Sequence, residues 1–472
     1  MLSPLTLTPA ETQAEEDYQK SSAQIVAMGA QWAALKKIET RTAEQEKQLQ
    51  QLSDQLDAAS KGLNDYYDRL FVLMGKNSEA NKQVADVKGD VSALEDQIAD
   101  TPRTVALYTI VSGDHYRVIV ITATATVARE FPIAEKDLNK KIADFEEVLR
   151  NPATDPKPLA QELYKILIGP VKADLDAAGA ETLVWSLDGA LRYVPMASLY
   201  DGKQYLAEDY NTVTITPASI AHLGEKPDVG GLSAAAMGIS LKFENGLPPL
   251  PAVVGELNEI VKDANVTGAN GALPGMILLD GQFTEKGMEN ALGGGHTVVH
   301  IASHFVFKPG DDSQSYLLLA GKDLGGGGFH LTVADFRDNK SLAMRHIELL
   351  TLSACETGMS GTASNGREVD GLGTTAQLKG AKAVISSLWE VDDASTGELM
   401  GDFYRRWVEG GGKVTKVEAL RQAQLDLLSG KVKPVAGQSG RGFALDEPPD
   451  ETPVGYAHPF YWAPFVLMGN WR

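Results

Sequence analysis

Two stretches of the sequence decide the fold: VVHIASHF, residues 298–305, and IELLTLSACETG, residues 347–358. Each begins as a short apolar run, which is typical of a parallel strand buried on both faces. His304 stands near the end of the first stretch and Cys355 near the end of the second. Functional groups in an open parallel sheet lie in the crevice beyond the carboxyl ends of the strands. We therefore expect both side chains at that edge of a sheet.

Strands and helices alternate around these two stretches, which predicts an α/β fold: a mostly parallel sheet with helices on both faces. The expected strands are 235–240, 276–279, 297–302, 347–353 and 383–388, and the expected helices are 252–264 and 284–292.

An earlier α/β unit is predicted before this sheet. It consists of a hairpin of strands 104–111 and 116–122, helices 136–149 and 157–177, and a strand 182–187. The sequence Asp-Val-Gly-Gly at 228–231 is typical of a linker, so we expect a boundary near residue 230.

Residues 1–100 have the composition of long helices, and no Pro occurs between Ala10 and Asp100. Apolar residues recur at three- and four-residue spacing, which indicates stripes that a helical hairpin or coiled coil would bury. A last helix is expected from Ser78 to Gln97. Since the segment has no candidate reactive group, we expect it to be a scaffold or to dock a regulatory protein partner. The predicted domains are a helical arm over 1–100, a first α/β unit over 101–230 and a second over 231–472.

The composition excludes several classes of protein. A chain of 472 residues, 43% hydrophobic and 22% charged, is folded and too long for one core. A formal charge of −20 disfavours nucleic acid and anionic lipid as direct partners. No run of about 18 apolar residues and no secretory signal occur, so neither a membrane span nor export is expected. The one Cys excludes an internal disulfide and fits a reducing compartment, so the cytoplasm is the expected location.

Cys355 is the single thiol of the chain. A thiol with a pKa near 8.5 is mostly protonated at neutral pH, and a neighbouring imidazole raises the thiolate fraction and returns the proton to a leaving amine. Cys355 and His304 are therefore the smallest set that could cleave an amide by acyl transfer. His300 is an alternative base, but its mid-strand position favours a packed, hydrogen-bonded core residue. Gly358 is expected to close a turn that lifts the thiol out of its strand.

The sequence predicts neither a cofactor site nor a metal site. Its eight His residues and one Cys have no metal-ligand spacing, and the glycines at 325–328 lack the Lys-Ser/Thr ending of a phosphate-binding loop.

Four ordered blocks resemble the CHAT domain, a family of bacterial caspase-like modules related to separase. They are HIASH at 300–304, LSACETG at 352–358, GAKAV at 380–384 with LWEVDD at 388–393, and HPFYWAPF at 458–465, joined in the first half by DGALRYVP at 188–195. The resemblance runs from about residue 102 to the C-terminus, and four blocks in order are specific where one would be weak.

The resemblance implies a caspase-like sheet preceded by an inactive caspase-like unit, and a cysteine endopeptidase that works through a thioester. Cys355 and His304 match the family's dyad of nucleophile and base. The backbone N–H groups of Phe305 and Cys355 would form the oxyanion hole. Phe305 stands where the family usually has Gly.

Asp393 falls where separase has the acid that pairs with a basic P1 side chain, and Asp392 is a second candidate. A carboxylate in that pocket would favour Arg or Lys at P1. From the residues alone, Asp393 could equally cap the helix expected to begin near Ala394. The expected function is cleavage of a protein or peptide substrate after a basic residue, controlled by a partner or signal. A catalytically silent protein-interaction module and a Cys-dependent acyltransferase or amidase stay open as alternatives.

Overall fold

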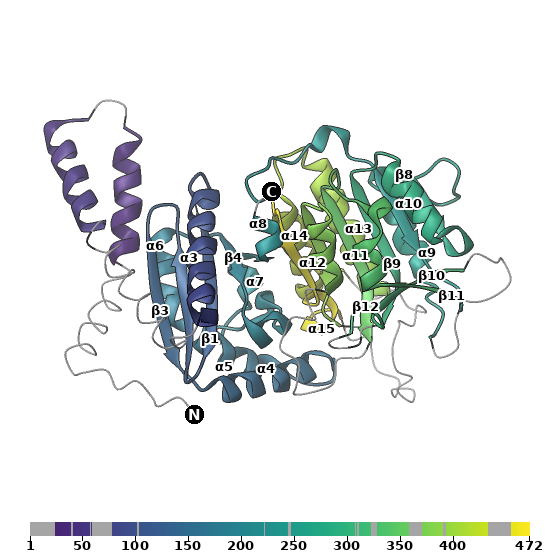
Figure 1. The fold of residues 1–472 in the computed structure, drawn as a ribbon, viewed down its shortest axis with the longest axis horizontal. Helices are drawn as coiled ribbons and strands as arrows, with labels where there is room; N and C mark the ends of the chain where they lie inside the picture. The colour runs from purple at the N-terminus through teal and green to yellow at the C-terminus, as the bar shows by residue number, and fades with distance from the viewer. Residues whose placement is uncertain are drawn as a thin grey trace. The chain divides into compact units, whose positions relative to one another are not determined.

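The computed structural model describes most of the chain (Figure 1). The described residues are 24–38, 41–56, 58, 78–101, 103–220, 222–243, 247–306, 308, 311–321, 328–357, 371–389, 393–432 and 455–472; for 78–86, 229, 354–357 and 393 the description covers the backbone alone. The chain divides into two compact units, Met1–Asn139 with Gln161–Asp188 and Lys140–Ala160 with Gly189–Arg472.

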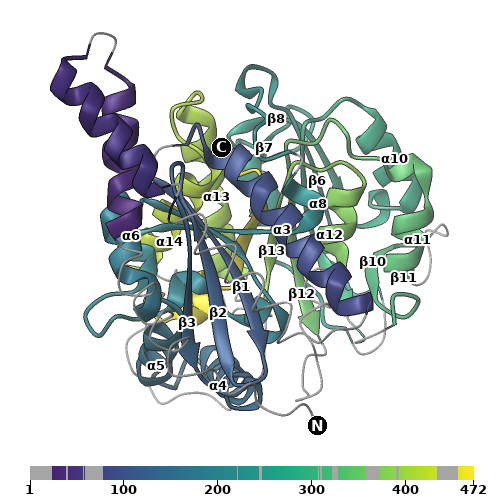
Figure 2. The ribbon, with the colours of Figure 1, turned by 60° about the vertical axis from the view of Figure 1, so that its left-hand side comes forward.

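The sheet of the first unit is mostly antiparallel. Its strands are β1 (Thr104–Ser112), β2 (His115–Ile121) and β3 (Thr126–Pro132), which run side by side (Figure 2), and β4 (Thr182–Ser186), which joins β1 in parallel. The hairpin predicted from the sequence is confirmed, since Ser112 pairs with His115 across the turn. Gly113 has a φ of +63° there, a conformation that glycine adopts without strain.

Helices are present at the N-terminal end, as predicted: residues 24–36 and 43–56 are helical, and α3 spans Ser78–Ile98. α3 contacts β1 and β2, and over residues 87–98, where its side chains are described, the buried apolar residues are Val87, Val91, Leu94 and Ile98. The apolar stripe of α3 is therefore covered by the sheet, whereas its spacing alone suggested a helical hairpin or coiled coil.

Three helices follow β3: α4 (Glu135–Leu149), α5 (Lys157–Leu167) and α6 (Lys172–Ala178). The single helix expected over 157–177 is wrong, because a 3₁₀ turn at Gly169–Val171 separates α5 from α6. Pro170 in this turn has no backbone N–H to donate and would clash with the carbonyl four residues before it in a continuous α-helix.

The sheet of the second unit is mostly parallel, as predicted. In spatial order its strands are β5 (Asn211–Ile215), β14 (Phe465–Gly469), β13 (Ala383–Ser387), β12 (Leu349–Thr357), β9 (Val298–Val306), β6 (Ala234–Gly238), β8 (Leu273–Leu279) and β7 (Val261–Lys262). Of these neighbours, β13 and β14 pair antiparallel and the others pair parallel. The hairpin of β10 (Tyr316–Ala320) and β11 (Gly328–Thr332) joins the end of β9.

Helices cover both faces of this sheet. Val299 and Ile301 of β9 belong to a core that includes residues of α10 (Glu285–Gly293), α11 (Val333–Asp338) and α12 (Gly371–Leu378). His300, which alternates with them, contacts residues of α9 (Val253–Ile260) and α13 (Asp393–Glu409) on the opposite face. α14 (Lys416–Leu428) packs beside α13 (Figure 1). No helix within the described ranges has the length and apolarity that crossing a bilayer requires.

A buried ion pair joins β3 to α6 in the first unit. The Nε atom of Arg129 donates to Oδ2 of Asp174 at 2.8 Å, and Nη2 donates to Oδ1 at 3.1 Å. The Asp174 side chain is fully buried, and this burial raises the pKa of its carboxyl although the guanidinium opposes the shift. Removal of either partner would leave a charge without compensation in the core.

Arg129→Met is expected to lower the free energy of unfolding by about 3–5 kcal/mol, because it leaves the Asp174 carboxylate buried and unpaired. The double variant Arg129→Met/Asp174→Leu should recover most of that loss. Lys172→Ala is the matched control: it removes the exposed pair of Lys172 with Asp176 on the same helix and should cost less than about 0.5 kcal/mol. Urea unfolding followed by circular dichroism measures all three, and equal losses for Arg129→Met and the control would contradict the prediction.

Candidate active site

β9 and β12 place His304 and Cys355 next to each other. The two strands are parallel neighbours and pair residue by residue, with Cys355 opposite His304. Neighbouring strands lie about 4.8 Å apart, so the side chains of register partners on one face of a sheet can reach each other. The structure thus brings the two predicted residues together, although they are 51 positions apart in the chain (355 − 304).

Both strands continue farther than their apolar runs suggested. β9 ends at Val306 and β12 at Thr357, so His304 and Cys355 are strand residues. The expectation that a turn lifts Cys355 out of its strand is therefore wrong, and Gly358 lies outside the described residues. The physical reason is pairing: β12 stays paired with β9 as far as Thr357, and β10 pairs with the last residues of β9.

The imidazole of His304 is held by a backbone carbonyl. Its Nε2 atom lies 2.8 Å from the carbonyl oxygen of Pro248, and the residue is only 6% exposed. Because a carbonyl oxygen can only accept a hydrogen bond, Nε2 carries the hydrogen. In the neutral ring Nδ1 is then the basic nitrogen. Sequence reasoning missed Pro248, since a main-chain acceptor leaves no residue-type signal.

Pro248 belongs to the β6–α9 loop, residues 239–252, which Asp280 anchors at its start. Oδ1 of Asp280 accepts hydrogen bonds from the backbone N–H groups of Ser240 at 2.6 Å and Leu241 at 3.0 Å, and Oδ2 accepts from the Ser240 hydroxyl at 2.7 Å. The Leu250 N–H donates to the Ser240 carbonyl at 2.9 Å, which ties the two described ends of the loop together.

Asp280 itself has a positive φ of +51°, which non-glycine residues rarely adopt. Among non-glycine residues of the described chain, only Arg103 shares this property. The three hydrogen bonds to the β6–α9 loop compensate for that conformation and make Asp280 a second residue that sequence reasoning missed.

His300 occupies a closed hydrogen-bond network on the same strand. Its Nε2 lies 2.9 Å from Oε1 of Glu256, and its Nδ1 lies 3.3 Å from the hydroxyl of Tyr404. That hydroxyl also lies 2.6 Å from Oγ1 of Thr351 on β12. Burial raises the pKa of Tyr404, so its hydroxyl remains a hydrogen-bond donor. With both ring nitrogens engaged and no exposed surface, His300 fits the packed core residue that its mid-strand position suggested.

Phe305 points away from His304. It is buried in the core on the opposite face of the sheet, and its backbone pairs with Leu317 of β10. Its φ is not positive, so the position does not require the glycine that the family usually has there. The roles of the Phe305 and Cys355 N–H groups as oxyanion donors stay predictions.

Asp393 is the first residue of α13, while Asp392 lies outside the described residues. The sequence suggested a helix that begins near Ala394 and is capped by Asp393. Because α13 begins at Asp393 itself, Asp393 lies in the first turn of the helix and not at the capping position before it. The two residues that follow β13 are held by hydrogen bonds: the Leu388 N–H donates to the Pro464 carbonyl at 3.0 Å, and the Trp389 indole donates to the Phe460 carbonyl at 3.2 Å. Two of the quoted sequence blocks therefore contact each other.

No match was found among curated proteins. Similar solved structures include the Arg-specific cysteine proteinase gingipain R, 12% identical over 71% of this chain and 75% of that one, with a TM-score of 0.36. They also include the complex of the RgpB pro- and mature domains of Porphyromonas gingivalis, 11% identical over 71% and 77%, with a TM-score of 0.35. A third is the separase–securin complex of Saccharomyces cerevisiae, 10% identical over 91% of this chain and 34% of that one, with a TM-score of 0.45.

A family model gives the assignment. The model of the CHAT domain matches residues 157–470, well over half of the chain. This range contains β9 and β12 with the register partners His304 and Cys355, and the two sequence blocks that contact each other at Leu388. The chain therefore belongs to the CHAT domain family.

Proposed function

We propose that the chain is a cysteine endopeptidase in which Cys355 is the nucleophile and His304 the general base. The observation that carries the proposal is the register of β9 and β12, which makes the single thiol of the chain the strand partner of His304. The hydrogen bond to Pro248 adds to it, because it favours the tautomer in which Nδ1 can accept a proton.

In the proposed reaction, Nδ1 of His304 takes the proton of the Cys355 thiol, and the thiolate attacks the carbonyl carbon of the scissile amide. The tetrahedral intermediate collapses when the C–N bond breaks and the leaving amine takes the proton from His304. A water molecule then gives a proton to His304 and attacks the thioester, which releases the acid and regenerates the thiol. The N–H groups of Phe305 and Cys355 are proposed to stabilise the oxyanion.

For specificity we propose a basic P1 residue, Arg or Lys, with Asp393 as the pairing carboxylate and Asp392 as the second candidate. Support comes from the position of Asp393 in the block that follows β13 and from the contacts that fix Leu388 and Trp389 just before it. A carboxylate in such a pocket would attract a guanidinium or ammonium group and repel an acidic side chain.

We further propose that a regulatory protein docks on the N-terminal helices before α3. Residues 24–36 and 43–56 are helical, while the apolar face of α3 is already used by its own sheet. The docking region is accordingly narrower than the arm expected over residues 1–100.

Cys355→Ala and His304→Ala are each expected to abolish cleavage, and the double variant should be no worse than either single one, because the residues of a dyad act as a unit. The substrate is first found by a proteomic screen of cleavage sites that compares the intact protein with Cys355→Ala. The derived peptide then gives kcat/KM for each variant.

A near-normal rate for folded His304→Ala would overturn the assignment of the base. A screen without any Cys355-dependent cleavage would favour a catalytically silent interaction module. Cys355-dependent turnover of small amides without cleavage of proteins would favour an amidase or acyltransferase.

Asp280→Gly should lower kcat by about ten- to a hundredfold with little change in KM, because it releases the β6–α9 loop that presents Pro248 to His304. Glycine keeps the positive φ, so the backbone conformation itself is not penalised. Asp280→Asn is the matched control and should retain most of the rate, since its amide oxygen still accepts from the two backbone N–H groups.

The pH dependence of Cys355 alkylation provides a readout specific to the base. We expect Asp280→Gly to shift the pH at which the thiol becomes reactive, whereas Asp280→Asn should leave it in place. A folded Asp280→Gly protein with unchanged kcat and an unchanged pH profile would show that the loop does not position His304.

Asp393→Ala should reduce cleavage of a basic-P1 peptide by about one to two powers of ten and affect a neutral-P1 peptide far less, since a charge-assisted pair is lost. Asp392→Ala identifies which of the two carboxylates acts. If Asp393 only stabilises the start of α13, the free energy of unfolding of the variant falls by about 1 kcal/mol, and its activity falls by the same factor on all substrates. Rates for Arg, Lys, Met and Asp at P1 separate the two outcomes, and a preference for Asp in the unmodified protein would exclude the basic pocket.

A further inference from the structure

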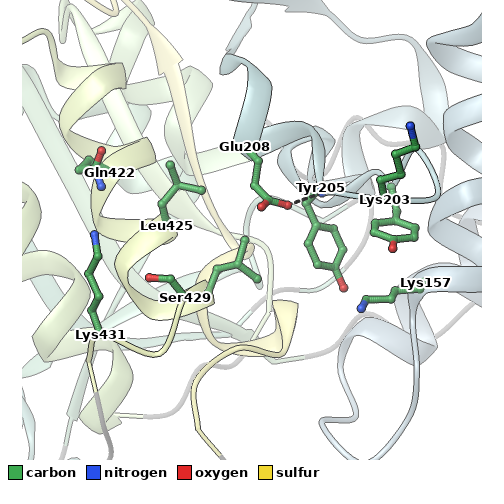
Figure 3. A pocket seen from close by; sticks show the side chains of 10 residues that line it. Lys157, Lys203, Tyr205, Glu208, Gln422, Leu425, Ser429 and Lys431 are labelled. Atoms are coloured by element: carbon green, nitrogen blue, oxygen red, sulfur yellow. Dashed lines mark hydrogen bonds between the residues drawn. The ribbon is translucent and has the colours of Figure 1, made fainter.

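A second concave site lies in the second unit, at the start of α5, along the segment from Tyr200 to α7 (Leu206–Asp209) and at the end of α14 (Figure 3). It encloses about 400 Å³, a volume typical of sites for small molecules. The described residues that line it include three lysines and one glutamate. The chain as a whole has 63 acidic and 43 basic residues and is therefore negatively charged, whereas the residues that line this cavity carry a net positive charge.

Tyr205 supplies an unused hydrogen-bond donor to the cavity. The residue is 5% exposed, and its ring is fixed by the rings of Trp462 and Tyr200 at centroid distances of 5.4 and 5.3 Å. Its hydroxyl has no hydrogen-bond partner among the described residues, and Figure 3 shows it directed toward Lys157. Burial raises the pKa of Tyr205, so the hydroxyl keeps its proton.

Two of the lysines carry charges that no described carboxylate neutralises. The ammonium of Lys157 is held 5.3 and 6.0 Å from the ring centroids of Tyr200 and Tyr205, and Lys203 lines the same cavity. Neither makes an ion pair with the described part of the chain.

The carboxylates nearby are each engaged by another donor. Glu208 accepts from the backbone N–H of Tyr205 at 2.7 Å, and Asp155 accepts from that of Lys157 at 3.1 Å. Asp426 accepts from the third lysine, Lys431, at 2.6 Å. The lining side chains sum to +2 (three lysines and one glutamate).

We infer that this cavity binds a phosphomonoester of a small organic molecule. A phosphomonoester carries about −1.5 to −2 charges at pH 7 and three strong acceptor oxygens, which match two unneutralised ammonium groups and the Tyr205 hydroxyl. Leu425, Leu428 and the Tyr200 ring offer apolar surface to the organic group. Neither His304 nor Cys355 is among the residues that line the cavity. The inference therefore does not depend on the proposed peptidase activity.

Isothermal titration of the full chain with phenyl phosphate tests the inference, with inorganic phosphate and benzoate as comparison ligands. We expect binding of one phenyl phosphate per chain, weaker binding of inorganic phosphate, which lacks the apolar group, and weakest binding of the monoanionic benzoate. Lys157→Ala should weaken phenyl phosphate by tenfold or more, and Tyr205→Phe, which keeps the ring packing, by about three- to tenfold.

Lys286→Ala is the matched control, because it removes an exposed ammonium of α10 that does not line the cavity. It should bind phenyl phosphate as the unmodified protein does. Absence of saturable binding, or equal losses in Lys157→Ala and Lys286→Ala, would overturn the site. Benzoate that binds as tightly as phenyl phosphate would overturn the assignment to phosphate, and unchanged affinity in folded Tyr205→Phe would remove the hydroxyl from it.

Discussion

The parallel pairing of β9 with β12 is the constraint on which the rest of the candidate site depends. A shift of the register by one residue would turn one strand's side chains to the other face of the sheet and separate His304 from Cys355. The core on one face and the network of His300, Glu256, Tyr404 and Thr351 on the other oppose such a shift. Thr351 and His300 are themselves register partners, so this network connects the two strands four residues before the candidate dyad.

Much of the fold could be predicted from the sequence where the signal is local. Apolar runs identified β9 and β12, and the turn residues around Gly113 identified the hairpin of β1 and β2. All but one of the errors occurred where partners far apart in the chain decide the outcome. β9 and β12 extend because they pair with each other and with β10, and the stripe of α3 is covered by strands that follow it in the sequence. The exception is the helix expected over 157–177, because Pro170 within that range already indicates an interruption in the sequence itself.

The candidate site shows the same division. His304 and Cys355 were predicted because their residue types are rare and their positions near strand ends are distinctive. Pro248 and Asp280 could not be predicted, since one acts through its main chain and the other through the main chain of a distant loop. A carboxylate that binds backbone N–H groups looks in the sequence like any other surface acid. Only the fold shows that three of its hydrogen bonds converge on one loop.

The carbonyl that holds His304 belongs to the main chain, and this affects how such a site can evolve. Every amino acid carries a carbonyl, so replacing the side chain at position 248 cannot delete the hydrogen-bond acceptor. The arrangement is robust to point substitution at that position but sensitive to insertions and deletions, because a change in the length of the β6–α9 loop would carry the oxygen away from the ring. Among relatives with this fold, the length of the β6–α9 loop would therefore indicate a correctly positioned imidazole better than the identity of the residue at position 248.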